Sequence, residues 1–352
     1  MWGVFYGIDN FFNYPNWGYN PCGYHDWRLP NVNEMASLLN PGQAPGWLNS
    51  QGFVNIQRNY WTSTTSLSSP GEAWYVDIAG YIGRIAKSNN STAFFMLVRD
   101  TLTEPRSQVI RTGQSTCYDN YSGIGIACAG TGQDGELQKG VAAPSPRFAN
   151  PDGSIPAVQD VVLDRLTHLM WTRNAYLPGV TKTWQGALDY VAGLNAGSGY
   201  GGYTDWRLPN LFELRSLQVY SQSSPALPSG HPFTNIPSEN PYWTSDTTHG
   251  HPTDANMVGM DGYYGGGFGI NVKTVDYYHG VWAVRGGAPN AAAGDLNLDG
   301  IIDLTDAIIA LQVISGISTL NQPQMGYADI NQDGRIGLPE AIYVLQEVAG
   351  LR

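Results

Sequence analysis

A six-residue motif, Asp-Trp-Arg-Leu-Pro-Asn, occurs twice in this chain of 352 residues, and such a duplication restricts the fold to two copies of one unit. His25-Asp-Trp-Arg-Leu-Pro-Asn31 recurs as Thr204-Asp-Trp-Arg-Leu-Pro-Asn210. A glutamate follows each asparagine by three residues, a spacing that begins a helix as a capping box. The motif therefore predicts helices over residues 32–39 and 211–219, each with one apolar face toward a core.

The duplication continues beyond the motif. Tyr60-Trp-Thr-Ser63 recurs as Tyr242-Trp-Thr-Ser245, and Leu97-Val-Arg99 recurs as Ala283-Val-Arg285. Between them lie alternating segments such as 74–78, which predict strands with one buried face. Each copy is therefore expected to be an α+β unit, with both tyrosines near the start of a strand.

The second copy has a front half that the first copy lacks. It begins near Phe148, passes through Thr167-His-Leu-Met-Trp171 and continues as a helix from residue 184 to about 195. Thr183 is placed to cap the start of this helix, and Gly197 to close its end.

Only 24 residues precede the motif in the first copy. We therefore expect the chain to begin inside this copy and its signal peptide to be lost with the missing part. The core of the first copy should lack one layer, which would leave Met35 and Leu38 partly exposed. The organisation predicted in this way has four parts: a truncated unit at 1–100, a Gly/Thr-rich connector at 101–147, a complete unit at 148–287 and an acidic C-terminal module at 288–352.

The three cysteines form an odd set. Cys117 and Cys128 bracket a glycine-rich turn, and we expect them to form a disulfide in an oxidising compartment. Cys22 is then left over, either as a free buried thiol or as the partner of an upstream cysteine.

Two twelve-residue segments of the C-terminal module have the ligand spacing of a calcium loop, which supplies oxygens from positions 1, 3, 5, 7, 9 and 12 and turns at a glycine at position 6. The first loop offers Asp295, Asn297, Asp299, the carbonyl of Ile301, Asp303 and Asp306. The second offers Asp329, Asn331, Asp333, the carbonyl of Arg335 and Glu340, with a water at position 9. An apolar helix follows each loop, so we expect two bound Ca²⁺ ions.

These two loops in register resemble a type I dockerin over about residues 294–352. That resemblance implies a small all-α module that folds around calcium and docks onto a cohesin-like protein or another surface scaffold. The positions that select the partner in that family are Leu304-Thr305 and Leu338-Pro339 here. They differ between the two halves and lack the paired hydroxyls of cellulosomal members.

The repeated motifs, with Leu169-Met-Trp171 upstream and Val-Arg at the end, resemble the Lcl C-terminal domain family over about residues 10–100 and 105–287. This resemblance implies an α+β fold of the C-type-lectin or sulfatase-modifying type and binding to polysaccharides or host glycans. It brings no catalytic residues. Asp26 and Asp205 lie beside Arg28 and Arg207 in the sequence, and we expect these pairs to fix turns.

Four tyrosines flank a Gly-Gly-Gly loop in which the two copies differ most, and their rings are candidates for a glycan-binding face or for a folded-back cap. They are Tyr263, Tyr264, Tyr277 and Tyr278. No protease, hydrolase, phosphate-loop or dinucleotide motif is present, so we expect a protein without catalytic residues. His249 and His251 with Asp254 form a weaker candidate for a transition-metal site.

The net charge of −11 is concentrated in the C-terminal module, where eight acids oppose two arginines. No basic stripe for nucleic acid and no apolar run long enough for a bilayer is present. We therefore expect an extracellular or surface-displayed adhesion or polysaccharide-binding protein. The alternatives are an enzyme of polysaccharide breakdown that carries a dockerin and a structural component of a surface fibre.

Overall fold

The structure is a computed structural model, and it describes residues 23–40, 42–44, 46–87, 93–100, 109–119, 122–237, 240–260, 268–274, 279–286, 294, 296, 302, 304–317, 330–331 and 335–351. The fold is a mixture of small antiparallel sheets and short helices. No helix among the described residues combines the length and apolarity that crossing a membrane requires.

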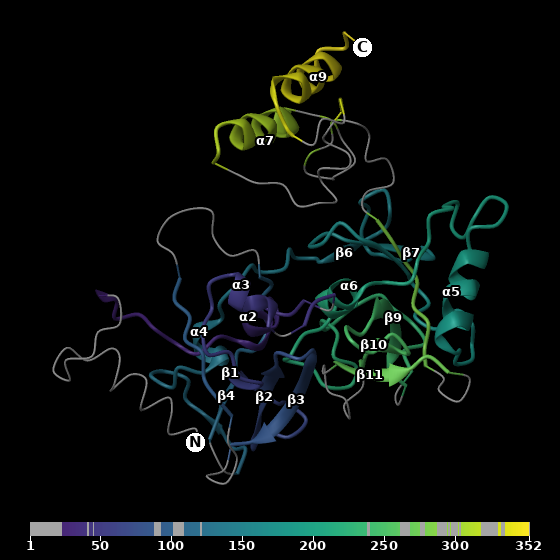
Figure 1. The fold of residues 1–352 in the computed structure, drawn as a ribbon. Coiled ribbons are helices and arrows are strands. Elements are labelled where there is room, and N and C mark those ends of the chain that lie inside the picture. The colour runs from purple at the N-terminus through teal and green to yellow at the C-terminus, as the bar shows by residue number, and fades with distance from the viewer. Residues whose placement is uncertain are drawn as a thin grey trace.

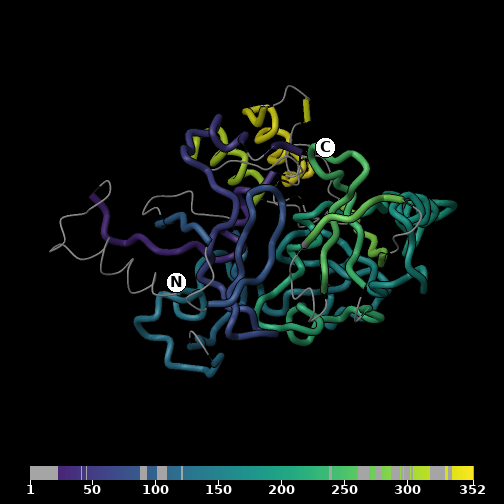
Figure 2. Tube along the Cα trace, turned by 60° about the horizontal axis from the view of Figure 1, so that its bottom comes forward, coloured from purple at the N-terminus to yellow at the C-terminus, as the bar shows by residue number. Residues whose placement is uncertain are grey.

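The two copies of the repeated unit join in one antiparallel sheet of six strands, in the order β1-β2-β3-β11-β10-β9. The first copy supplies β1 (Asn59–Thr65), β2 (Glu72–Asp77) and β3 (Tyr81–Ala86), and the second supplies β9 (Tyr242–Thr247), β10 (Asp254–Val258) and β11 (Phe268–Val272). The joint lies between β3 and β11, where Ile82 pairs with Phe268. Figures 1 and 2 show the copies lying side by side across this joint. The duplication predicted from the sequence is therefore built as a pair with one shared sheet.

Both predicted capping boxes are present at the starts of α2 (Val32–Ala36) and α6 (Leu211–Ser216). The helices are shorter than predicted, and at the end of each one a serine hydroxyl bonds a glutamate carbonyl of the preceding turn. Ser37 Oγ donates to the carbonyl oxygen of Glu34 at 2.7 Å, and Ser216 Oγ donates to that of Glu213 at 2.6 Å. Helix α2 packs on β1 and β2, and α6 packs on β9 and β10.

The front half of the second copy forms a second sheet, in the order β12-β8-β7-β6. Its strands are β6 (Phe148–Ala149), β7 (Val161–Asp164), β8 (Met170–Thr172) and β12 (Val284–Arg285). Helix α5 (Trp184–Gly193) follows β8, and Thr183 caps it as predicted by accepting from the amide of Gly186 at 3.1 Å. The helix ends two residues earlier than predicted. Trp171 of β8 is fully buried among residues of α6 and β12.

One hydrophobic core spans both copies. Trp74 of β2 meets the ring of Tyr220 edge-on at 5.3 Å between ring centroids, which places the two copies in direct contact. Met35, which the sequence analysis expected to be partly exposed, is only 1% exposed because it lies within this shared core. That expectation was wrong for Met35 and is confirmed for Leu38, which is half-buried.

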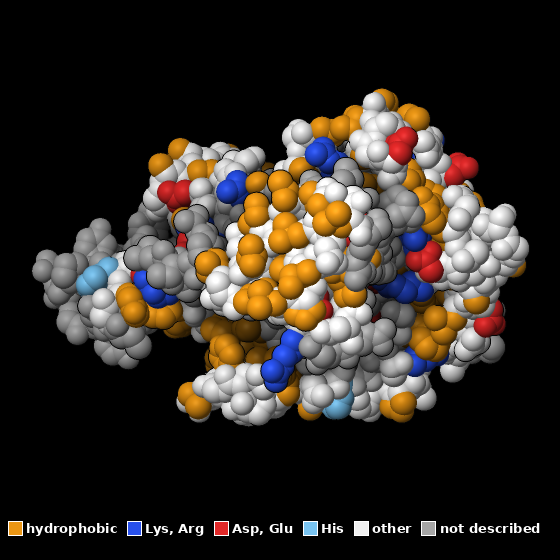
Figure 3. All heavy atoms as spheres, turned by 90° about the horizontal axis from the view of Figure 1, so that it is seen from above, with side chains coloured by type: hydrophobic (Ala, Val, Ile, Leu, Met, Phe, Trp, Pro, Cys, Tyr) orange, Lys and Arg blue, Asp and Glu red, His pale blue; other side chains and the backbone are white. Residues whose placement is uncertain are grey.

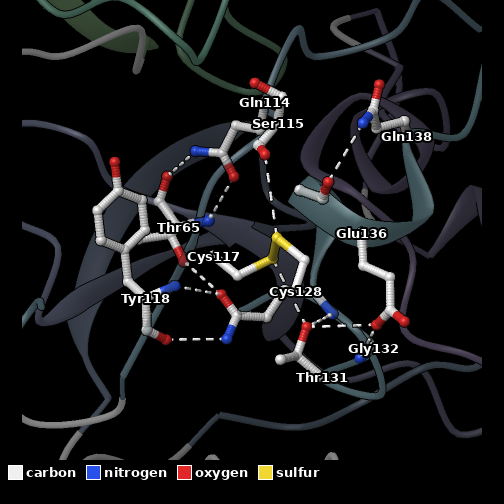
Figure 4. Close-up of a disulfide and its surroundings, with 12 residues drawn as sticks. Thr65, Gln114, Ser115, Cys117, Tyr118, Cys128, Thr131, Gly132, Glu136 and Gln138 are labelled. Carbon is white, nitrogen blue, oxygen red and sulfur yellow. Dashed lines mark hydrogen bonds between the residues drawn. A yellow bond between two sulfur atoms is a disulfide. The ribbon is translucent and has the colours of Figure 1, made fainter. Parts of the chain in front are cut away.

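The connector between the copies is more than a linker. Its described part contains β4 (Cys117–Tyr118), β5 (Gly125–Ile126) and α4 (Asp134–Leu137). Cys117 and Cys128 form the disulfide expected from the sequence, with their Cα atoms 5.2 Å apart (Figure 4).

Polar side chains of the connector are buried against the first copy. The amide of Thr65 donates to Gln114 Oε1 at 3.1 Å, and Gln114 Nε2 donates to the carbonyls of Thr65 and, at 3.2 Å, Tyr220 (Figure 4 shows the Thr65 bonds). Asp134 accepts hydrogen bonds from the hydroxyls of Thr64 at 2.7 Å and Thr112 at 2.6 Å. Because one connector side chain bonds residues of both copies, the connector helps to fix their relative position.

The arginines of the repeated motif pair differently from the expectation. Asp26 binds Arg99 at 2.8 Å and Asp205 binds Arg285 at 2.7 Å, so each motif aspartate pairs with the Val-Arg arginine near the end of its own copy. The motif arginines pair instead with the capping-box glutamates: Arg28 with Glu34 at 2.7 Å and Arg207 with Glu213 at 2.5 Å. The pairs Asp26–Arg99 and Asp205–Arg285 join the repeated motif to the end of each unit.

Three further helices complete the described structure. Helix α3 (Trp47–Ser50) lies between α2 and β1 in the chain. Helices α7 (Leu304–Ile314) and α9 (Leu338–Val348) form the C-terminal module, and both begin where the two loop patterns end.

Candidate functional site

The last ligand position of each predicted calcium loop is a buried carboxylate. Asp306 lies in the first turn of α7, Glu340 lies in the first turn of α9, and both are 0% exposed. Asp306 Oδ1 accepts from the amide of Leu296 at 2.7 Å, and Glu340 Oε2 accepts from the amide of Gly337 at 2.7 Å. Each carboxylate is therefore oriented by the backbone of its own loop.

Glu340 provides a direct test of whether a cation fits. Its Oε1 atom is buried and has no hydrogen-bond partner among the residues that the structure describes. A buried carboxylate oxygen without a partner has a large desolvation cost unless a positive charge offsets it. Calcium accepts carboxylate oxygens in this way, with a glutamate at position 12 binding through both oxygens. The side chain that the structure describes at this position therefore fits a calcium ligand.

Of the other predicted ligands, Asn331 and Arg335 are described and both are exposed. Seven lie outside the described residues: Asp295, Asn297, Asp299, Ile301, Asp303, Asp329 and Asp333. Within the described part of the chain, no three His, Cys, Asp or Glu side chains gather to hold an ion, and this includes His249, His251 and Asp254. The complete ligand sets and the presence of two ions stay predictions.

A small core holds α7 and α9 against each other. It consists of Leu296, Ala307, Ala310, Ile336, Ala341 and Val344. Three of these residues are alanines, which allow two helices to approach closely. Few side chains are buried here, so the packing of this module supplies little stability by itself, and the loops that precede both helices become important for its folding.

Each helix of the module turns an apolar row outward. The first row is formed by Leu304, Ile308, Leu311, Ile314 and Ile317, and the second by Leu338, Ile342, Leu345, Val348 and Leu351. The two rows correspond residue by residue, and exposed fractions run from 38% at Val348 to 77% at Leu351. Figure 3, which looks down on the side that carries α7 and α9 in Figure 1, shows hydrophobic side chains gathered on this surface.

The sequence analysis did not identify these rows as a candidate site. The signal was present, because apolar residues at intervals of three and four form one stripe on each helix. Only the structure shows that the alanines face the partner helix while the larger side chains face outward. Contiguous exposed apolar side chains of this kind are typical of interaction surfaces.

The proposed glycan-binding tyrosines, Tyr263, Tyr264, Tyr277 and Tyr278, lie outside the described residues. Beside them in the sequence is His279, which is buried and contacts the ring of Trp243 with centroids 4.4 Å apart. Burial lowers the pKa of His279 to about 4, so this imidazole is neutral at physiological pH. It is part of the core rather than a polar group presented to a ligand.

The comparisons with known families agree with these observations. The family model of the Lcl C-terminal domain matches residues 13–99 and 160–285, and that of the dockerin type I domain matches residues 293–337. The second match includes Asp306 and ends just before α9. Neither the curated proteins nor the solved structures contain a match to the chain.

Proposed function

The chain belongs to the Lcl C-terminal domain family and carries a dockerin type I domain at its C-terminal end, and from this premise we propose that it is a non-enzymatic, calcium-dependent surface component. In this proposal, the dockerin attaches the repeated domains to a cohesin-bearing scaffold outside the cell. The repeated domains then present an adhesive or polysaccharide-binding surface.

The observation that supports attachment most directly is the combination of buried carboxylates and exposed apolar rows on the same two helices. Asp306 and Glu340 are buried at the starts of α7 and α9, while the two apolar rows on the same helices face outward. Calcium at the loops would fix the positions of the helix starts, and the helices would then present the two rows at a defined spacing. Partner binding would consequently depend on calcium through the shape of the module.

A calcium titration of the full chain tests this proposal. We expect Ca²⁺ to increase the helical circular dichroism signal and EDTA to reverse the increase. Glu340→Gln should weaken calcium binding at the second loop at least about tenfold, because a neutral amide replaces the bidentate carboxylate. Glu347→Gln is the matched control, since Glu347 lies on the same helix outside the loop, and it should bind calcium like the unmodified chain.

Equal calcium affinity of the two variants would contradict the assignment of Glu340. The partner is tested separately by binding to immobilised type I cohesins with calcium and with EDTA. Ile308→Asp and Ile342→Asp place a charge in the first and second apolar rows, so each should reduce binding without changing calcium affinity. Retained cohesin binding in the double variant would refute the role of the rows.

The adhesive or polysaccharide-binding role rests on the resemblance of the repeated domains and on their pairing. The C-type-lectin or sulfatase-modifying type of fold belongs to the same proposal, supported by the helix and three-stranded unit that occurs in both copies. A glycan array with the calcium-loaded chain tests the role. Measurable turnover of a polysaccharide would instead favour a degrading enzyme, and self-assembly without glycan affinity would favour a fibre component.

A further inference from the structure

The second copy has an open hollow of about 460 Å³ at the start of β7 (Figure 1). The turn after β6, the approach to β7 and the glycine-rich loop after α5 form its walls. These walls consist of Pro151, Val158, Gln159, Asp160, Val161, Gly201 and Tyr203, all of which the structure describes. A volume of this size lies within the usual range of small-molecule sites, so the hollow has room for a small ligand.

The glycine-rich loop comes very close to β7 at Gly201. The backbone of this residue has a φ of +62°, which lies in the left-handed region that favours glycine. A Cβ atom added at Gly201 would also lie only 2.5 Å from Cγ2 of Val161, the first residue of β7. Glycine is therefore required for the loop and the strand to form adjoining walls of the hollow.

Tyr203 is the aromatic wall of the hollow, and its neighbours hold its ring in place. The guanidinium carbon of Arg285 lies 3.9 Å from the centroid of the ring, and the ring of Trp206 meets it edge-on with centroids 6.5 Å apart. Arg285 is in turn fixed by its ion pair with Asp205 at 2.7 Å. Tyr203 is only half-buried, so an oriented ring remains partly accessible from the hollow.

Two polar side chains line the same hollow. Gln159 and Asp160 are exposed, and neither side chain forms a hydrogen bond or an ion pair with any residue that the structure describes. Their backbone is nevertheless fixed, because the amide of Gln159 donates to Asn150 Oδ1 at 3.0 Å and the carbonyl of Asp160 accepts from the amide of Arg173 at 2.8 Å. The carboxylate and the amide are therefore positioned by the backbone and available to a ligand.

The charge of the lining restricts the class of ligand. The lining contains the Asp160 carboxylate and no lysine or arginine, so an anionic ligand would meet a like charge without a compensating cation. A metal ion is also disfavoured, because no three His, Cys, Asp or Glu side chains gather anywhere in the described ranges. A neutral molecule with several hydroxyl groups fits, since a carboxylate accepts from hydroxyls and a side-chain amide both donates and accepts.

We propose that this hollow binds one or two sugar residues of a neutral polysaccharide. Asp160 accepts hydrogen bonds from sugar hydroxyls, Gln159 bonds the neighbouring hydroxyls, and Tyr203 packs against the C–H face of a sugar ring. This assignment rests on the proposed function, in which the repeated domains bind a polysaccharide. It places the binding in the second copy and restricts the ligand to uncharged sugars.

Isothermal titration calorimetry of the full chain with calcium present tests the site. The neutral probes are cellobiose, xylobiose, mannobiose, maltose and lactose, and a sulfated chondroitin disaccharide is the charged comparison. We expect at least one neutral disaccharide to bind saturably. The sulfated disaccharide should bind at least about tenfold more weakly than that probe, because Asp160 repels its charge.

Variants of the chain provide the complementary test. Asp160→Asn should weaken binding of the neutral disaccharide at least about fivefold, because hydrogen bonds to an ionised group are stronger than those to a neutral group. Gln159→Ala should weaken it about threefold through loss of the amide. Asp189→Asn is the matched control, since Asp189 is exposed on α5 and does not line the hollow, and it should bind like the unmodified chain. All three side chains are exposed, so thermal unfolding should be unchanged.

Three results would overturn the assignment. The first is no saturable binding of any neutral disaccharide. The second is equal affinity in Asp160→Asn and Asp189→Asn, which would place the sugar elsewhere on the chain. The third is tighter binding of the sulfated disaccharide than of every neutral one. In each case, binding of the chain to a glycan array would still support the proposed function, whereas failure on the array as well would remove the polysaccharide-binding role itself.

Discussion

The two copies of the repeated unit share their motifs, their capping boxes and their ion pairs, yet they differ in what covers them. Leu217 and Val284 of the second copy are completely buried, and Val284 lies in β12 beside β8 in the second sheet. Their counterparts Leu38 and Val98 line a groove. Local sequence therefore reproduces local structure in both copies, whereas burial depends on elements that are distant in the chain.

The largest expected effect is a difference between matched leucines. Leu217→Ala should lower the free energy of unfolding by about 2–5 kcal/mol, because it removes a fully buried side chain from a packed core. Leu38→Ala should cost roughly 1 kcal/mol, since part of that side chain already contacts solvent. Urea unfolding of both variants measures the difference, and similar losses would show that the groove is closed in solution.

The next effect concerns the carboxylates that lie behind the starts of α2 and α6. In the second copy, Asp246 accepts directly from the amide of Leu211. In the first copy, Thr64 accepts from the amide of Val32 and donates to Asp134 of the connector. Burial raises the pKa of Asp134 to about 6 and also raises the pKa of Asp246.

A raised carboxyl pKa means that the native state binds the proton more tightly than the unfolded chain does. Its stabilising contribution is complete below about pH 4 and is lost as the pH rises through about 6, a change of about 3 kcal/mol for Asp134. Asp134→Asn should remove that part of the pH dependence. As the pH rises from 4 to 7, the unfolding free energy of the variant should therefore approach or exceed that of the unmodified chain. Chemical unfolding at several pH values measures this, and parallel profiles would count against it.

The smallest expected effect is a difference between matched arginines. Here the larger loss of stability is expected in the first copy, not in the second. The side chain of Arg28 is 11% exposed and binds both Glu34 and Asp100, whereas that of Arg207 is 44% exposed and binds Glu213. Arg28→Met should therefore destabilise by about 1–2 kcal/mol and Arg207→Met by less than about 1 kcal/mol. Thermal unfolding at low and high salt compares them. A larger loss of stability for Arg207→Met would contradict this order. The contribution of each ion pair would then depend on coverage by the front half of the second copy and not on the burial of the arginine.

Much of the local structure followed from the sequence alone. The capping boxes at Asn31 and Asn210, the N-cap at Thr183 and the helices after both calcium-loop patterns depend on residues within one or two turns, so their spacing was sufficient to predict them. The Cys117–Cys128 disulfide also joins near neighbours. In the C-terminal module, the loop spacing predicted Asp306 and Glu340 as position-12 ligands, and both side chains are buried in the structure.

The tertiary structure decided what depends on contacts between distant segments. The pairing of Asp26 with Arg99 and the joint between Ile82 and Phe268 connect residues far apart in the chain, and a sequence pattern does not specify such partners. The outward apolar rows of α7 and α9 became visible only when the packing of the alanines was known. The groove beside Val98 has the same origin. Leu97-Val-Arg99 and Ala283-Val-Arg285 differ at one position, yet Val98 is half-buried and Val284 is buried, because β8 lies beside Val284.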